Sequence, residues 1–145
     1  MENTRTTAHE PLLVARDITK DYGSGPVLGG ISLSVRAGET VAIMGPSGSG
    51  KSTLLHCLSG VLQPSTGEVR FAGAELSAAG DRRRSRIRLH DFGFVFQDGQ
   101  LLDELPAAEN VALAARLAGT TRAAAEREAV DLLSRLGVGG LADRR

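Results

Sequence analysis

The sequence contains no tryptophan, only one tyrosine and only four phenylalanines among its 145 residues. Few aromatic side chains are therefore present to fill a core, although 41% of the residues are apolar. That apolar share is typical of a folded globular protein and excludes a long disordered chain. We therefore expect a core of Leu, Val, Ile and Ala side chains.

Cysteine, long apolar runs and excess charge are scarce as well. The single cysteine, Cys57, excludes an internal disulfide and fits a reducing compartment. No apolar run approaches the roughly 18 residues that a membrane span requires. The formal net charge of +0 argues against a nucleic-acid partner bound through bulk electrostatics. We expect a cytoplasmic protein with a loose, polar N-terminal tail over residues 1–10.

Glycine, in contrast, is frequent, and the segment MGPSGSGKSTLLHCLSG (44–60) contains several close together. Residues 45–52 match the pattern G-x-x-x-x-G-K-S. Gly45, Gly48 and Gly50 allow positive φ and a close approach of the backbone to a ligand. Successive N–H groups in such a loop form a concave site for anions. The segment therefore predicts a phosphate-binding loop.

The flanks of this loop supply the context that the motif requires. The apolar run 40–44 predicts a buried strand before it, and 53–59 predicts a helix after it that stops at Gly60. Lys51 brings a positive charge to the β- and γ-phosphates, and the Ser52 hydroxyl suits Mg²⁺. The alternative, a flexible Gly/Ser turn, does not account for the four fixed identities of this pattern between a strand and a helix.

The rest of the chain predicts a mixture of strands and helices. An arginine-rich helix over 81–90 is expected to present a solvated face, with anionic lipid headgroups or an acidic partner loop as alternatives. Because the core strands 41–44 and 92–96 lack a predicted neighbour, we expect an exposed apolar sheet edge and marginal stability. The other predicted strands are 12–18, 27–36 and 68–71, and the other helices are 106–118, beginning at Pro106, and 122–136, which packs Ala125, Ala129, Leu132, Leu133 and Leu136 and stops at Gly137.

Two motifs, the phosphate loop and FGFVFQDGQLLDELPAAENV (92–111), together resemble the N-terminal portion of an ABC transporter ATP-binding subunit. The likeness covers about residues 12–145 and is strongest to the lipoprotein-release and macrolide-export branch. It implies an α/β P-loop NTPase fold with an N-terminal antiparallel β-subdomain and a core that is incomplete at the C-terminus. The implied unit is a partial nucleotide-binding domain over residues 11–145.

The resemblance also implies roles for individual residues. Tyr22 matches the aromatic residue that stacks on adenine, and Gln97 matches the Q-loop glutamine that reaches Mg²⁺ and the attacking water. Ser52 and Gln97 are thus the expected metal ligands, and Lys51 and Gln97 the expected catalytic residues. The residues expected to bind ATP are Tyr22, Gly45, Ser47, Gly48, Ser49, Gly50, Lys51, Ser52 and Thr53.

Three further family motifs have no match here. The acids of 101–104 imitate a Walker B end, but no buried strand precedes them, and 137–140 imitate the signature without its Ser or Gln. The switch histidine is also missing. By the family pattern the signature would begin shortly after Arg145. We therefore expect this chain to bind Mg-ATP weakly and to hydrolyse essentially none on its own.

The resemblance implies that ATP binding and hydrolysis drive transport or extraction at the cytoplasmic face of the cell membrane. The implied partners are a membrane-spanning transporter subunit and a second ATPase subunit, either identical in a homodimer or different. Asp103 places a charge where that membrane partner is expected. The alternative is a non-catalytic short form or split half that acts as a nucleotide-binding module. A P-loop kinase or GTPase is disfavoured, since Asn-Lys-x-Asp and an arginine-bearing lid are absent.

Overall fold

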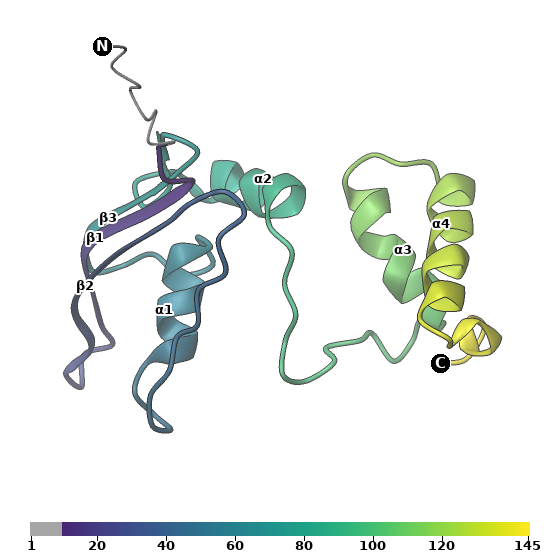
Figure 1. Cartoon of the computed structure of the whole chain (residues 1–145). Coiled ribbons are helices and arrows are strands. Elements are labelled where there is room, and N and C mark those ends of the chain that lie inside the picture. Colours follow the sequence, from purple (N-terminus) through teal and green to yellow (C-terminus); the bar gives the residue numbers. More distant parts are fainter. Residues whose placement is uncertain (1–9) are drawn as a thin grey trace, which may run out of the picture. The chain divides into compact units, whose positions relative to one another are not determined.

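The computed structural model describes residues 10–145, which divide after Arg88 into two compact units (Figure 1). The first unit ends within helix α2 (Asp81–Asp91), and the second comprises residues 89–145. The predicted N-terminal tail lies almost entirely outside the described residues. The assignment of residues 11–145 to one nucleotide-binding domain stays a prediction.

The first unit is built on one antiparallel sheet, which confirms the predicted antiparallel β-subdomain. The strand order is β2-β1-β3-β4, and every neighbouring pair is antiparallel. The short fourth strand was not expected from the sequence. The strands are β1 (Leu13–Asp21), β2 (Pro26–Val35), β3 (Thr66–Phe71) and β4 (Ala74–Glu75).

A bulge in β1 determines which of its side chains enter the core. Ala15 and Ile18 are both buried, although residues three apart in a regular strand face opposite sides. The register of β1 shifts between them against both neighbouring strands, and Asp17 has a left-handed φ of 46°. The extra residue reverses the alternation, so that both side chains reach the same core.

Helix α1 (Lys51–Leu58) contacts β1 and β2 through one apolar side. Leu54, Cys57 and Leu58 are its buried residues, so the predicted aliphatic core is confirmed here. Burial raises the pKa of the Cys57 thiol, and the positive charge of Lys20 opposes this shift to a smaller degree. The thiol is therefore a neutral packing group.

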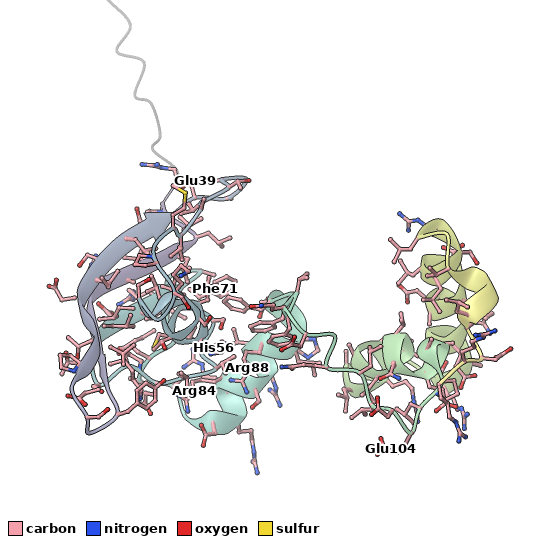
Figure 2. The ribbon with its side chains drawn as sticks, turned by 90° about the horizontal axis from the view of Figure 1, so that it is seen from below. Glu39, His56, Phe71, Arg84, Arg88 and Glu104 are labelled. Carbon is pink, nitrogen blue, oxygen red and sulfur yellow. The ribbon has the colours of Figure 1, made fainter. Side chains whose placement is uncertain are left out.

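The arginines of α2 divide between solvent and the interior of the first unit. Arg82, Arg83 and Arg86 are exposed, as predicted for a solvated face. Arg84 is buried, which contradicts that prediction, and the Nη1 of Arg88 donates a hydrogen bond of 2.7 Å to the carbonyl oxygen of Gly60. Positions 84 and 88 are one helical turn apart and so share the covered side of α2, as Figure 2 shows.

The second unit is a pair of helices, α3 (Ala107–Leu117) and α4 (Arg122–Arg135), followed by the short 3₁₀ helix η1 (Gly139–Leu141). Ala112 of α3 packs on Ala125 and Ala129 of α4. Small side chains at such a contact allow two helices to approach closely. Pro106 is the N-cap of α3 rather than its first helical residue.

The end of α4 follows the prediction, but part of its expected apolar face is exposed. Gly137 has a φ of 78° directly after the C-cap Leu136, so it terminates the helix as expected. Leu133 is buried, whereas Leu132 and Leu136 are exposed. The prediction was wrong for these two leucines because α3 covers only a narrow stripe of α4.

Neither of the two predicted core strands forms. Among residues 10–145, no strand pairs with 40–44 or 92–96, and Val41, Met44 and Val95 are exposed. A strand requires a neighbour that supplies its hydrogen bonds, and an apolar run does not provide one. The rings of Phe92, Phe94 and Phe96, at every second position of this segment, nevertheless stack on one another at 6.3 and 5.7 Å, as the alternation of an extended segment allows. Apolar side chains of these segments are exposed, but the exposed sheet edge that was predicted does not form there.

The burial of Arg84 leads to a prediction about stability. Its Nη2 pairs with the exposed Asp81, while its buried Nε and Nη1 have no hydrogen-bond partner among the described residues. An unsatisfied buried donor costs about 1–3 kcal/mol. We expect Arg84→Met to raise the free energy of unfolding by about 1–2 kcal/mol, measured by urea denaturation.

Arg86→Met on the exposed side of the same helix is the matched control. Its free energy of unfolding should change by less than about 0.5 kcal/mol. A loss of stability in Arg84→Met would show that the buried guanidinium stabilises the fold.

Candidate functional site

The glycine-rich segment between residues 44 and 51 forms a tight, exposed loop. Gly48 and Gly50 have φ values of 79° and 85°, a left-handed conformation that favours glycine. The Ser49 N–H donates to the Pro46 carbonyl oxygen across 3.3 Å. A Cβ at Gly45 would lie 2.8 Å from the Ser49 Oγ, so this glycine allows the two ends of the turn to approach.

Gly50 joins this loop to the sheet. A Cβ at this position would lie 2.9 Å from the carbonyl oxygen of Val27 and 3.1 Å from the Cδ2 of Leu28, both in β2. Leu28 is itself buried in the core. The start of α1 is therefore placed directly against β2, and the loop before it is held at that point of the sheet.

The first turn of α1 presents unpaired N–H groups. Gly50 is the N-cap and supplies no side-chain cap, and the first turn has no acidic residue. The first helical hydrogen bond runs from the Leu54 N–H to the Gly50 carbonyl oxygen, at 2.8 Å. Within residues 10–145, the N–H groups of 51–53 have no acceptor. Unpaired amides and the positive end of the helix dipole favour an anion at this place.

Lys51 and Ser52 add the two side chains expected of a polyphosphate site. The Lys51 ammonium donates to the carbonyl oxygens of Gly45 (2.9 Å) and Pro46 (2.7 Å), so it lies against the loop and keeps one further donor. The Ser52 side chain is exposed, and its hydroxyl has no partner in the described part of the chain. A cation and a free hydroxyl beside unpaired amides fit a phosphate chain with a bound Mg²⁺ ion.

Tyr22 lies at the end of the sheet next to the same loop. It directly follows Asp21, the last residue of β1. Asp21 pairs with Pro26 of β2, and the next residue of β2, Val27, lies against Gly50. The Asp21 carboxylate accepts hydrogen bonds from the N–H groups of Gly23 (2.6 Å) and Gly25 (3.3 Å), which fix the turn around the tyrosine. The Tyr22 side chain is 55% exposed. Tyr22 and the loop residues therefore both lie in the first unit, and the partner strand of Asp21 contacts the loop at Gly50.

Gln97 lies in the second unit, in an exposed bend after the extended segment. Its predicted role at Mg²⁺ stays a prediction. The acids that follow it, Asp103 and Glu104, lie in a loop, and no strand leads into them. Asn110 holds this loop, since its Oδ1 accepts from the Leu102 N–H at 2.8 Å and its Nδ2 donates to the Leu102 carbonyl oxygen at 3.0 Å.

Two residues of interest were missed from the sequence, Asn110 and Lys20. The Lys20 ammonium lies 5.3 Å from the centre of the Tyr22 ring and donates to the Gln63 carbonyl oxygen at 2.8 Å. The sequence did contain a signal for Lys20. It is a lysine two positions before an aromatic residue at the end of a strand, and the chain has only two lysines among its 17 basic residues. No sequence motif indicated their partners, which are Gln63 for Lys20 and Leu102 for Asn110.

A glycine-rich loop between a sheet and the unpaired start of a helix defines this as a protein of the phosphate-loop class. The ABC transporter family model matches residues 28–145. The chain therefore belongs to the ABC transporter family. No helix within residues 10–145 has both the length and the apolar character needed to cross a membrane.

Similar proteins agree with this assignment. The chain is 45% identical over 131 residues to the lipoprotein-releasing system ATP-binding protein LolD of Geobacter metallireducens, covering 88% of this chain and 58% of that protein. It is 47% identical over 133 residues to the macrolide export ATP-binding/permease protein MacB of Marinobacter nauticus, covering 89% of this chain and 21% of that protein.

A solved structure is similar in fold as well. The dimeric structure of a post-hydrolysis state of an ATP-binding cassette bound to ADP and Pi superposes with a TM-score of 0.85 at 30% identity. The match covers 92% of this chain and 61% of that chain. The present chain therefore spans little more than half the length of LolD and of this cassette.

The contact of Gly50 with β2 leads to a prediction that separates packing from backbone conformation. Gly48 and Gly50 are both left-handed, but a Cβ at Gly48 would meet no atom within 4 Å. Gly48→Ala should therefore lower the free energy of unfolding by about 1–2 kcal/mol, which is the cost of a left-handed backbone conformation for alanine. Gly50→Ala should lower the free energy of unfolding by about 1–3 kcal/mol more, because β2 must move.

Urea denaturation of the two variants measures this difference. If Gly48→Ala and Gly50→Ala lower the free energy of unfolding equally, the close approach of α1 to β2 does not require a glycine at position 50.

Proposed function

We propose that this chain is the nucleotide-binding part of an ABC transporter ATPase and binds ATP with Mg²⁺. The observation that carries the proposal is the unpaired first turn of α1, with the Lys51 ammonium on the loop before it. The names of LolD and MacB, which are ATP-binding proteins, and the ADP and Pi of the similar cassette support the same choice of ligand.

Each part of the site has a separate task in binding. The N–H groups of the loop and of residues 51–53 donate to phosphate oxygens, and Lys51 neutralises their charge. The Ser52 hydroxyl is a ligand for Mg²⁺, and Tyr22 stacks on the base, which is worth about 1–3 kcal/mol. Mg-ATP, when bound, supplies a phosphoryl group that is activated for transfer to water.

Hydrolysis is proposed to require residues outside these 145. Gln97 is proposed to act as a second Mg²⁺ ligand and to orient the attacking water, as in the family it resembles. Asp103 and Glu104 are poor substitutes for the catalytic acids, because they lie in a loop held by Asn110 and no buried strand fixes them. We therefore expect binding by this chain without measurable turnover.

In the complete assembly, the proposed partners are a second ATPase subunit and a membrane-spanning transporter subunit. The similar cassette is a dimer, LolD is named as part of a lipoprotein-releasing system, and MacB as a combined ATP-binding and permease protein. The exposed Leu101 and Leu102 after Gln97 offer apolar surface for the membrane partner. The proposed location is the cytoplasmic face of the membrane, where ATP binding and hydrolysis drive transport or extraction.

Removal of the loop lysine tests the nucleotide site. Lys51→Ala should abolish binding of a non-hydrolysable ATP analogue in isothermal titration calorimetry, because no other side chain of the loop is cationic. The circular dichroism spectrum should be unchanged, since the hydrogen bonds of the Lys51 ammonium within residues 10–145 go only to the carbonyl oxygens of Gly45 and Pro46 in the exposed loop.

Arg36→Ala, at the far end of β2, is the matched loss of one positive charge in the same unit. It should bind the analogue like the unchanged protein. Retained binding in Lys51→Ala, with an intact spectrum, would mean that the phosphates are not held by this loop.

A further inference from the structure

Lys20 lies beside Tyr22, the residue proposed to stack on the base of the nucleotide. It is half-buried in β1, and its ammonium lies 5.3 Å from the centre of the tyrosine ring. Within the described residues, its one hydrogen bond goes to the carbonyl oxygen of Gln63, at 2.8 Å. A cation at this distance from a ring centre is within the range of a cation–π interaction.

The ammonium is itself held in place. The Gln63 side chain donates to the carbonyl oxygen of Ser77 at 3.0 Å, which ties the segment before β3 to the residues after β4. Lys20 pairs in the sheet with Leu28, the buried residue that contacts Gly50. The lysine is therefore fixed both at its backbone, next to the phosphate loop, and at its terminal nitrogen.

The Tyr22 side chain combines a fixed backbone, a cation over its ring and a largely exposed surface. Its backbone belongs to the turn that the Asp21 carboxylate fixes, and the Lys20 ammonium covers one face of the ring. The side chain is still 55% exposed. A flat, partly exposed ring with one face occupied by a cation can stack a second ring only on its opposite face.

We propose that Lys20 is a positioning residue for Tyr22, which it holds in the orientation that stacks the purine base of the nucleotide. The inference rests on the proposed function and deepens it, because it assigns the base-binding part of the site to a pair of residues. Holding the ring before the ligand arrives reduces the entropy lost on binding. Lys20 should then affect the affinity for the base and leave the affinity for the phosphates unchanged.

Two probes, ATP and inorganic tripolyphosphate, separate these contributions in calorimetric titrations. Lys20→Met should weaken ATP binding about two- to fivefold and leave tripolyphosphate binding unchanged. Lys20→Arg should bind ATP nearly as well as the unchanged protein, because the cation over the ring is kept. Arg36→Met, a matched loss of charge at the other end of the sheet, should change neither affinity.

Tyr22→Ala provides the second half of the test. It should weaken ATP binding about five- to hundredfold, and adding Lys20→Met to it should cause no further loss. A further loss in the double variant, or weaker tripolyphosphate binding in Lys20→Met, would show that Lys20 acts on the phosphates and would overturn the inference. Unchanged tripolyphosphate binding also shows that a variant is folded.

The tyrosine offers a direct spectroscopic readout, because the chain has one tyrosine and no tryptophan. ATP should quench the tyrosine fluorescence, after correction for adenine absorbance, and tripolyphosphate should not. The Lys20→Met variant should require a higher ATP concentration for the same quenching. If Tyr22→Ala weakens ATP binding but Lys20→Met does not, this inference fails and the proposed function stands. If the unchanged protein binds neither probe, both fail.

Discussion

The contact between Gly50 and β2 is the constraint on which the arrangement of the site depends. Because residue 50 has no Cβ and is left-handed, the chain can turn from the loop into α1 while touching Val27 and Leu28. That contact places the unpaired amides of α1 beside the hairpin that carries Tyr22. Gly50 thus connects the aliphatic core on which α1 packs with the proposed anion site at the N-terminus of α1.

Much of the fold could be predicted because its signals are local. Alternating side chains predicted β2, and the glycine at position 137 predicted the end of α4; both are present, and Gly137 has the positive φ of a helix terminator. The strands expected at 40–44 and 92–96 were wrong, since an apolar run shows that a segment can be buried but not which strand pairs with it. The burial of Arg84 was missed for a related reason, because neighbouring arginines give no sign of which one the fold covers.

The residues of the candidate site also fall into those that local sequence predicts and those that only the folded structure shows. The loop residues are contiguous, so their spacing alone identified them, and the structure adds that the Lys51 ammonium lies against two carbonyl oxygens of the loop. The contacts of Lys20 with Gln63 and of Asn110 with Leu102 join residues that the sequence separates by other elements or by a turn. Contacts of this kind depend on the folded sheet and on the loop before α3, and no motif marks them.

Phosphate binding is proposed to depend on the amides of the loop and of the first turn of α1. Its most direct measurement is a titration of the ¹⁵N-labelled chain with Mg-ATP, followed through the backbone amide resonances. If these amides hold the phosphates, the largest shifts occur at residues 48–53, with smaller ones around Tyr22. Shifts centred on the exposed arginines of α2, or no shifts at residues 48–53 at saturating nucleotide, would contradict this proposal.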